Sequence, residues 1–433
     1  MQMRLIPRLC LTVLFLSGCF LEQGMGAEKG DEGDESKISP SEQGPDGLPK
    51  FRHPYTDGLY STVTAMNTFN APEVAKQKKL KLKVAGFRKE IPVYAIMQNH
   101  PAPLVVVLMG IDGKVDGPWG GLYPYWYDEA SKFQEPGFHV LTFDGTFSPR
   151  YSEISGLGVV GNFEAESEQV AAVIDAFLKL PENSKSITKV GVLGMSFGAT
   201  QALLLAARAK AGHLPFELSG CLALSPLVKF RASARIVDRY FAEDRWDTTM
   251  VELAKRFLPH VPVAEGQPIP FSATEMRAAI GFAFRDGLAK VVERNDSYYK
   301  LKVLPSEESG ENRVTYAEAT GLERFIDTLT FPYWNKKGTV KSADDLWNMG
   351  DLSKIIPRLP DFAEIVVAEN DPFNTPEDLA EAKAVDVRKC LTVLPRGGHL
   401  GFLAADWTLV KALRIFRSSI DKQQGGTPEQ KEK

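Results

Sequence analysis

The sequence predicts an α/β protein built on a mostly parallel sheet with helices on both faces. Short, continuous apolar runs, typical of strands buried on both faces, recur between residues 91 and 394. Segments with helical spacing of apolar residues fall between these runs, and such alternation is typical of parallel sheets. With 44% hydrophobic residues in a chain of 433, there is enough apolar side chain for a large core.

The expected strands follow from these runs in chain order. Residues 80–84 and 91–97 are expected to form an opening hairpin, and the first continuously apolar strand follows at residues 104–108. Further strands are expected at residues 138–143, 189–193, 219–224, 363–368 and 390–394. Helices are expected at residues 164–180, 199–209 and 403–416.

Residues 228–355 interrupt this alternation. Their pattern is mostly helical, with charged and aromatic residues mixed, and they follow the sixth expected strand. The simplest interpretation is an inserted, mainly helical cap. The α/β core is then expected in two parts, residues 51–227 and residues 356–420.

The first residues have the pattern of a signal peptide. Arg4 and Arg8 give a basic start, an apolar run follows at residues 9–16, and Leu-Ser-Gly-Cys ends at Cys19. This ending resembles the bacterial lipoprotein box. The resemblance implies cleavage of residues 1–18, a diacylglycerol on the thiol of Cys19 and acylation of the new amino terminus. An ordinary secretory signal with an incidental cysteine is the alternative.

The lipoprotein resemblance implies a mature protein anchored by lipid in the bacterial cell envelope. Phe20, in place of an aspartate, resembles the signal for sorting to the outer membrane. Residues 19–50 are acidic and rich in glycine, which predicts a flexible linker, and residues 421–433 are expected to form a disordered tail. The formal net charge of −4 is small and gives no sign of a nucleic-acid partner.

The pentapeptide Gly194-Met-Ser-Phe-Gly198 is the centre of the predicted chemistry. It follows an expected strand and precedes residues that favour a helix. This context is typical of a nucleophile elbow, in which glycines permit a strained turn that exposes a serine hydroxyl above the sheet. Ser196 is therefore the expected nucleophile. A Gly-rich structural turn is the alternative.

A serine nucleophile needs a base, and the base needs an acid that orients it. Among the six histidines, His399 is the candidate base, because it follows the last expected strand in a loop of small residues. The acid is expected after the preceding strand, where Asp371 stands before a proline that fixes the turn. Glu369 and Asp361 are rival acids, and a loop histidine without a catalytic role is the alternative for His399.

Attack on a carbonyl also requires hydrogen-bond donors for the oxyanion. One donor is expected to be the backbone N–H of Phe197, directly after the nucleophile. The other should come from the loop Met109-Gly-Ile-Asp-Gly113, where Gly110 allows close approach and the N–H of Ile111 is the candidate. A plain Gly-rich turn is the alternative for this loop.

These segments together resemble the α/β-hydrolase fold and, more narrowly, its YheT-like esterase branch. The narrower resemblance rests on residues 109–113, on residues 397–402 and on the run from Arg324 through Leu346 to Pro372. It implies serine-dependent hydrolysis of carboxylic esters without a metal or an organic cofactor. The chain departs from the branch at Met109, where many relatives have histidine, at Ala199 after the elbow, and in a longer cap.

A second Gly-rich motif, Gly156-Leu-Gly-Val-Val-Gly161, matches the dinucleotide fingerprint Gly-x-Gly-x-x-Gly. A loop, Asp144 to Ser155, is expected between this motif and the strand before it, so the glycines do not lead from a strand directly into a helix. Pyrophosphate binding needs that direct passage. Residues 156–161 are therefore expected to shape the rim of the active site.

The sequence shows no spacing typical of a metal site. Cys221 and Cys390 fall in the sixth and last expected strands, with another strand between them, so two buried thiols are expected in place of a disulfide. The predicted activity is that of a lipid-anchored carboxylesterase acting on a small-molecule or lipid-like ester. Acyl transfer or peptide hydrolysis by the same residues, and a binding protein that has lost activity, are the alternatives.

Overall fold

The computed structural model of the protein describes residues 78–111, 113, 137–242, 273–304, 317, 319–403, 407–408 and 410–416. The predicted signal peptide, Cys19, the linker and the tail lie outside these residues. Within the described ranges, no helix is both long and apolar enough to cross a membrane.

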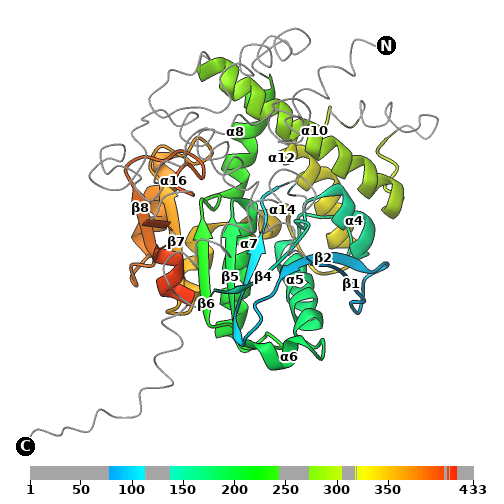
Figure 1. Cartoon of the computed structure of the whole chain (residues 1–433). Coiled ribbons are helices and arrows are strands. Elements are labelled where there is room, and N and C mark those ends of the chain that lie inside the picture. The colour runs from blue at the N-terminus through cyan, green and yellow to red at the C-terminus, as the bar shows by residue number, and fades with distance from the viewer. Residues whose placement is uncertain are drawn as a thin grey trace, which may run out of the picture.

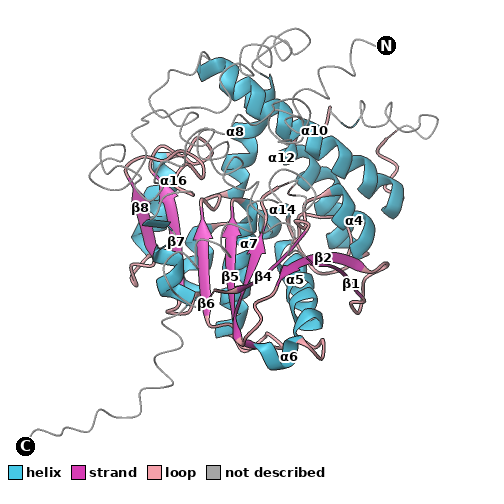
Figure 2. Ribbon diagram, in the orientation of Figure 1, coloured by secondary structure: helices cyan, strands magenta, loops and turns pink. Residues whose placement is uncertain are grey.

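The described strands form one sheet of eight in the order β1-β2-β4-β3-β5-β6-β7-β8 (Figure 2). They are β1 (Lys78–Leu82), β2 (Ile91–Ile96), β3 (Ala102–Leu108), β4 (His139–Phe143), β5 (Ile187–Met195), β6 (Gly220–Leu224), β7 (Ala363–Ala368) and β8 (Leu391–Leu394). β2 pairs antiparallel with β1 and with β4, and every other pair is parallel. The predicted mostly parallel sheet and its opening hairpin are confirmed.

Helices cover both faces of the sheet. α5 (Phe163–Leu178) and α7 (Phe197–Lys210) pack on one face, where alternate residues of β3 enter the larger hydrophobic core. The intervening residues of β3 point to the other face and share a second core with the helical residues 410–416. Because successive side chains of a strand point to opposite faces, a strand covered on both sides must be apolar throughout, and β3 is.

The segment after β4 differs from its predicted loop, because it contains the helix α4 (Pro149–Ser155). Its start and stop signals are local. The Ser148 hydroxyl accepts from the N–H of Tyr151 at 3.1 Å, Pro149 occupies the first turn, and Gly156 ends the helix in the left-handed conformation. The loop prediction was wrong because seven residues are too few to show a helical period.

The described residues between β6 and β7 are mainly helical, as predicted for the cap. They form α8 (Phe230–Ala242), α10 (Ala273–Tyr299), α12 (Leu322–Phe325), the π-helix η5 (Ile326–Thr330), α13 (Phe331–Lys336), α14 (Ala343–Met349), α15 (Leu352–Ile355) and the 3-10 helix η6 (Ile356–Arg358). α8 and α10 lie beyond the carboxyl ends of β5 and β6 (Figure 1). Two further helices lie outside the cap, α6 (Asn183–Ser186) and α16 (Pro376–Val385).

Candidate active site

Ser196 lies in the turn between β5 and α7. Its backbone has φ +55° and ψ −121°, a conformation that non-glycine residues rarely adopt. A Cβ on Gly194 would lie within 3.0 Å of the carbonyl oxygen of Gly198, and a Cβ on Gly198 would lie within 3.0 Å of that of Leu108. Both close neighbours are backbone atoms, which cannot move aside, so only glycine fits at either position.

The loop after β3 lies directly beside this serine. A Cβ on Gly110 would lie 3.3 Å from Cβ of Ser196 and 3.6 Å from its Oγ. The loop is held by the N–H of Gly113, which donates to Gly110 at 3.0 Å, and by the N–H of Gly145, which donates to Gly113 at 2.9 Å. Ile111 follows Gly110 at this point, and Phe197 occupies the first turn of α7, where amides have no partner within the helix.

Asp371 and His399 are in direct contact beyond β7 and β8. Nδ1 of His399 lies 2.8 Å from Oδ2 of Asp371, and Asp371 is 2% exposed. The other carboxylate oxygen accepts from the N–H of Phe373 at 3.0 Å, so the acid is held at both oxygens. The ring of Phe373 packs edge to face on the imidazole, with centroids 4.6 Å apart. This contact uses Nδ1, which assigns proton exchange with a hydroxyl to Nε2.

The sheet brings Ser196 and the histidine loop to the two sides of the carboxyl end of β6. The N–H of Ser196 donates to Leu224, the last residue of β6, at 2.9 Å. The next residue, Ser225, accepts from the N–H of Leu400 through Oγ at 3.0 Å. Asn370 accepts from the N–H of Gly398 at 2.8 Å, so both neighbours of the candidate histidine are fixed.

Ser225 is a site-building residue that the sequence analysis missed. It is fully buried and has φ +47°, a strained value for a residue with a side chain. Its position gave one available signal, since it directly follows a buried strand and precedes a proline. Its contact with Leu400 spans 175 residues, which no local pattern reveals.

The rival acids make contacts elsewhere. Glu369 lies 3.4 Å from Lys383, and the side chain of Asp361 is fully exposed and lies 3.4 Å from Arg388. Of the three carboxylates weighed from the sequence, the structure therefore places Asp371 on the candidate histidine.

The other described histidines lie away from Ser196. His139 is fully buried; Nδ1 accepts from the N–H of Gln98, and Nε2 lies 3.0 Å from the carbonyl oxygen of Ser186. Burial lowers the pKa of His139. His100 and His213 are exposed. His53 and His260 lie outside the described residues.

An apolar cavity lies between the loop after β3 and the cap. It is lined by Ile111, Phe147, Val237, Asp238, Phe284, Arg285, Leu288 and Leu322. The two charged residues in this lining pair with each other, Nη2 of Arg285 lying 2.8 Å from Oδ1 of Asp238. The enclosed space is about 10 Å³, room for about one water molecule.

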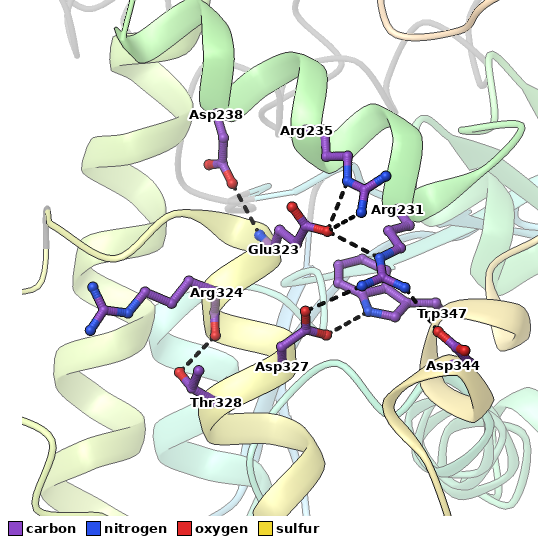
Figure 3. Close-up of polar contacts among 9 residues, drawn as sticks. All are labelled: Arg231, Arg235, Asp238, Glu323, Arg324, Asp327, Thr328, Asp344 and Trp347. Carbon is purple, nitrogen blue, oxygen red and sulfur yellow. Dashed lines mark hydrogen bonds and ion pairs between the residues drawn. The ribbon is translucent and has the colours of Figure 1, made fainter.

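The segment from Arg324 to Leu346, which carries part of the family resemblance, contributes Asp327 and Asp344 to polar contacts within the cap. Arg231 of α8 reaches Glu323, Asp327 and Asp344, and Arg235 reaches Glu323 (Figure 3). Asp327 also accepts from the indole of Trp347 at 2.8 Å. Asp238 accepts from the N–H groups of Leu322 and Glu323, which caps α12. These contacts fix α8 to the rest of the cap.

The Gly156–Gly161 loop lies under the cap. The N–H of Gly158 donates to the hydroxyl of Tyr299, and that of Gly161 donates to Glu166. From the cap, the indole of Trp334 donates to the carbonyl of Val159 at 2.7 Å. The loop is therefore bound on several sides by protein groups.

The described residues hold no cluster of three or more His, Cys, Asp and Glu side chains that could bind a metal ion. Cys221 and Cys390 are free and buried, as predicted. Burial raises the pKa of both thiols, that of Cys390 to about 12, so neither is an activated nucleophile at neutral pH.

Comparison with known proteins gave one family match. The model of the alpha/beta hydrolase family (Abhydrolase_6) matches residues 117–410. A search of curated proteins found no match. Among solved structures, an esterase of Pyrococcus furiosus is similar at 14% identity and a TM-score of 0.40, covering 79% of this chain and 91% of that one. A carboxyl esterase from Bacillus coagulans in complex with glycerol is similar at 12% identity and a TM-score of 0.40, covering 78% and 99%. Likeness at this level does not bear on activity.

Proposed function

This chain belongs to the alpha/beta hydrolase family, and we propose that it is a serine hydrolase that cleaves carboxylic esters through an acyl-enzyme intermediate. The observation that carries the proposal is the hydrogen bond between His399 and the buried Asp371, at the sheet edge where a strained turn presents Ser196. A buried carboxylate on Nδ1 orients the imidazole and stabilises its charged form.

In the proposed reaction, Oγ of Ser196 attacks the ester carbonyl while Nε2 of His399 takes the hydroxyl proton. The N–H groups of Phe197 and Ile111 stabilise the oxyanion. The bond to the alcohol oxygen then breaks, and the imidazolium returns its proton to the departing alkoxide. Water, deprotonated by the same imidazole, attacks the acyl-enzyme and releases the acid and Ser196.

Apolar side chains of the cap next to Ile111 support an ester with an apolar acyl or alkyl group. They come from helices α8, α10 and α12 and enclose a space of about 10 Å³, room for about one water molecule. A substrate group next to the proposed oxyanion donor therefore requires these side chains to move apart.

A series of p-nitrophenyl esters of increasing acyl length tests this proposal. The wild-type protein should hydrolyse some members of the series, with one preferred length, and Ser196→Ala should remove the activity. A folded wild-type protein inert to the whole series would contradict ester hydrolysis and favour the binding-protein alternative. Faster acyl transfer to an added alcohol or amine than to water would favour the acyltransferase alternative.

We further propose that Cys19 carries the lipid that anchors the protein to the outer membrane. Cys19→Ala should leave an uncleaved precursor that carries no acyl chain, which mass spectrometry of the purified protein detects. Cys10→Ala is the matched control, because that cysteine lies inside the predicted apolar run and should not affect lipidation. A Cys19→Ala protein that is still cleaved and acylated would contradict the anchor.

A further inference from the structure

One face of α8 holds the loop that carries Asp371. The Ser233 hydroxyl lies 2.8 Å from the carbonyl oxygen of Phe373, and the Tyr240 hydroxyl donates to that of Pro372 at 2.9 Å. Ser233 and Tyr240 are 1% and 6% exposed, so neither bond competes with bulk water. The serine hydroxyl also lies 3.1 Å from the carbonyl oxygen of Lys229, which directly precedes α8, and the shorter contact is the one to the loop.

The spacing of these donors places them around the cavity. Positions 233, 237 and 240 fall on one side of a helix, since residues four and three apart are neighbours. Val237 lines the apolar cavity, and the two donors flank it along α8. The same helix face therefore contacts both the small apolar cavity beside Ile111 and the loop that carries Asp371.

Phe373 connects this helix face to the candidate acid and base. Its carbonyl accepts from Ser233, its N–H donates to Oδ1 of Asp371, and its ring packs against the imidazole of His399. The ring of Phe284 in α10 also packs against the ring of Phe373, with centroids 5.8 Å apart. A shift of the Phe373 backbone would therefore disturb both the hydrogen bond to Asp371 and the ring that packs against His399.

We propose that Ser233 and Tyr240 are positioning residues that set the Asp371–His399 geometry from the cap. The proposal rests on the proposed esterase function. The two hydroxyls hold consecutive carbonyls of the loop and so keep the N–H of Phe373 on the carboxylate. Without them the loop is still held by its own turn and by the N–H of Val228, which donates to Oδ1 of Asn374 at 2.8 Å, but Pro372 and Phe373 lose their bonds to α8.

The helix itself has other attachments, which makes the proposal separable from a general role in cap stability. Arg231 and Arg235 tie α8 to α12 and η5 on the side shown in Figure 3. Lys229 pairs with Glu381 of α16. Removing two buried hydroxyls therefore leaves α8 anchored.

The test compares Ser233→Ala, Tyr240→Phe and their double variant with Arg235→Ala. The control residue is on the same helix and is exposed, and its ion pair with Glu323 stays within the cap. In ester hydrolysis we expect the double variant to lose about 10-fold to 100-fold in kcat with KM changed less than about 2-fold. Arg235→Ala should keep wild-type kcat.

A second readout does not depend on activity. A histidine Nδ1–H bonded to a carboxylate gives a far-downfield proton resonance, which Asp371→Asn should abolish. In a Ser196→Ala background, the double variant should shift or broaden this resonance, and Arg235→Ala should preserve it. A folded double variant with wild-type kcat and an unmoved resonance would overturn the positioning role. Wild-type protein inert to all esters would instead overturn the function, and the resonance would still decide the positioning.

Discussion

Two Gly-rich segments of this chain look alike in sequence, but glycine is required for a different physical reason in each. In residues 194–198 the glycines are needed because backbone packs against backbone, which leaves the serine between them in a strained turn. In residues 156–161 all three glycines have positive φ values, and cap side chains also press on Gly158 and Gly161. A Cβ on Gly158 would lie within 3.0 Å of Tyr333 and Trp334, and one on Gly161 within 3.0 Å of Ile326.

The fate of the backbone amides separates the two segments. In the loop, the N–H groups of Gly158, Val160 and Gly161 donate to Tyr299, Asn295 and Glu166. A phosphate site needs such amides for its ligand, and here protein groups occupy them. The elbow places Phe197 at the start of a helix, where amides face outward from the helix end. Glycine spacing alone does not distinguish these cases; the partners of the N–H groups do.

The elbow side of the comparison predicts the largest effect. Ser196→Ala and His399→Ala should each reduce ester hydrolysis by roughly 10⁴-fold to 10⁶-fold, and the double variant should be scarcely worse, because the residues act as one unit. Asp371→Asn should cost as much or less, since it mainly misorients the imidazole. Steady-state kinetics on purified, folded variants measures this. Additive losses in the double variant would contradict a shared proton-transfer unit.

The backbone packing of the elbow predicts the next effect. Gly198→Ala places a methyl group against the carbonyl of Leu108 and should destabilise the protein by about 3 kcal/mol or more, with loss of esterase activity. Gly212→Ala is the control: its φ is +72° with nothing within 4 Å, so strain alone should cost about 1 kcal/mol. Urea unfolding measures both. Equal losses would show that packing does not impose glycine at the elbow.

Glu166, which accepts from the N–H of Gly161 in the second Gly-rich segment, predicts a pH dependence of stability. This residue is fully buried, and desolvation raises its pKa from 4.5 to about 7. Because the folded state keeps the proton while the unfolded state loses it, stability should fall as pH rises from about 4.5 to about 7, by roughly 3 kcal/mol, and then level off. Glu166→Gln should remove this fall.

The surroundings of Glu166 can accept the amide. Among the described residues, Oε1 of Gln201 has no partner, so it can accept from the new side chain after an amide flip. Glu168→Gln is the control, since its side chain is 60% exposed on the same helix. Urea unfolding between pH 5 and 8 gives the slope. An unchanged slope in Glu166→Gln would refute the assignment.

The cap contact on the loop predicts the smallest effect. Trp334→Phe removes the bond to Val159 and should lower the free energy of unfolding by about 1 to 3 kcal/mol. If the loop is structural, kcat for the preferred ester should remain within about 2-fold of wild type. A large loss of kcat at unchanged stability would instead place the loop in the reaction.

The sheet could be predicted from the sequence because each strand carries its own signal. β3, β4 and β6 are buried along their whole length, so they are almost entirely apolar, with His139 and Thr142 of β4 as the polar exceptions. Gly194 and Gly198 mark the elbow equally locally, since the turn itself requires them. The short helix α4 escaped notice because seven residues carry caps but no period.

The residues that support the candidate site could not be predicted in this way. Ser225, Ser233 and Tyr240 act through contacts that span 175, 140 and 132 residues. Nothing in the flanking sequence separates such a hydroxyl from one that faces water. The contact of Asp371 with His399 was expected because their loops follow neighbouring strands and so lie at the same edge of the sheet. The bonds from α8 to Pro372 and Phe373 depend on the position of the cap, which the sequence does not indicate.

Covalent labelling tests the central claim, that Ser196 is an activated nucleophile, most directly. A fluorophosphonate probe should modify the wild-type protein at one serine, and mass spectrometry of the peptides should locate it at Ser196. Labelling should be absent in Ser196→Ala and far slower in His399→Ala, because the hydroxyl then lacks its base. A folded wild-type protein that stays unlabelled, or is labelled at another serine, would contradict the account.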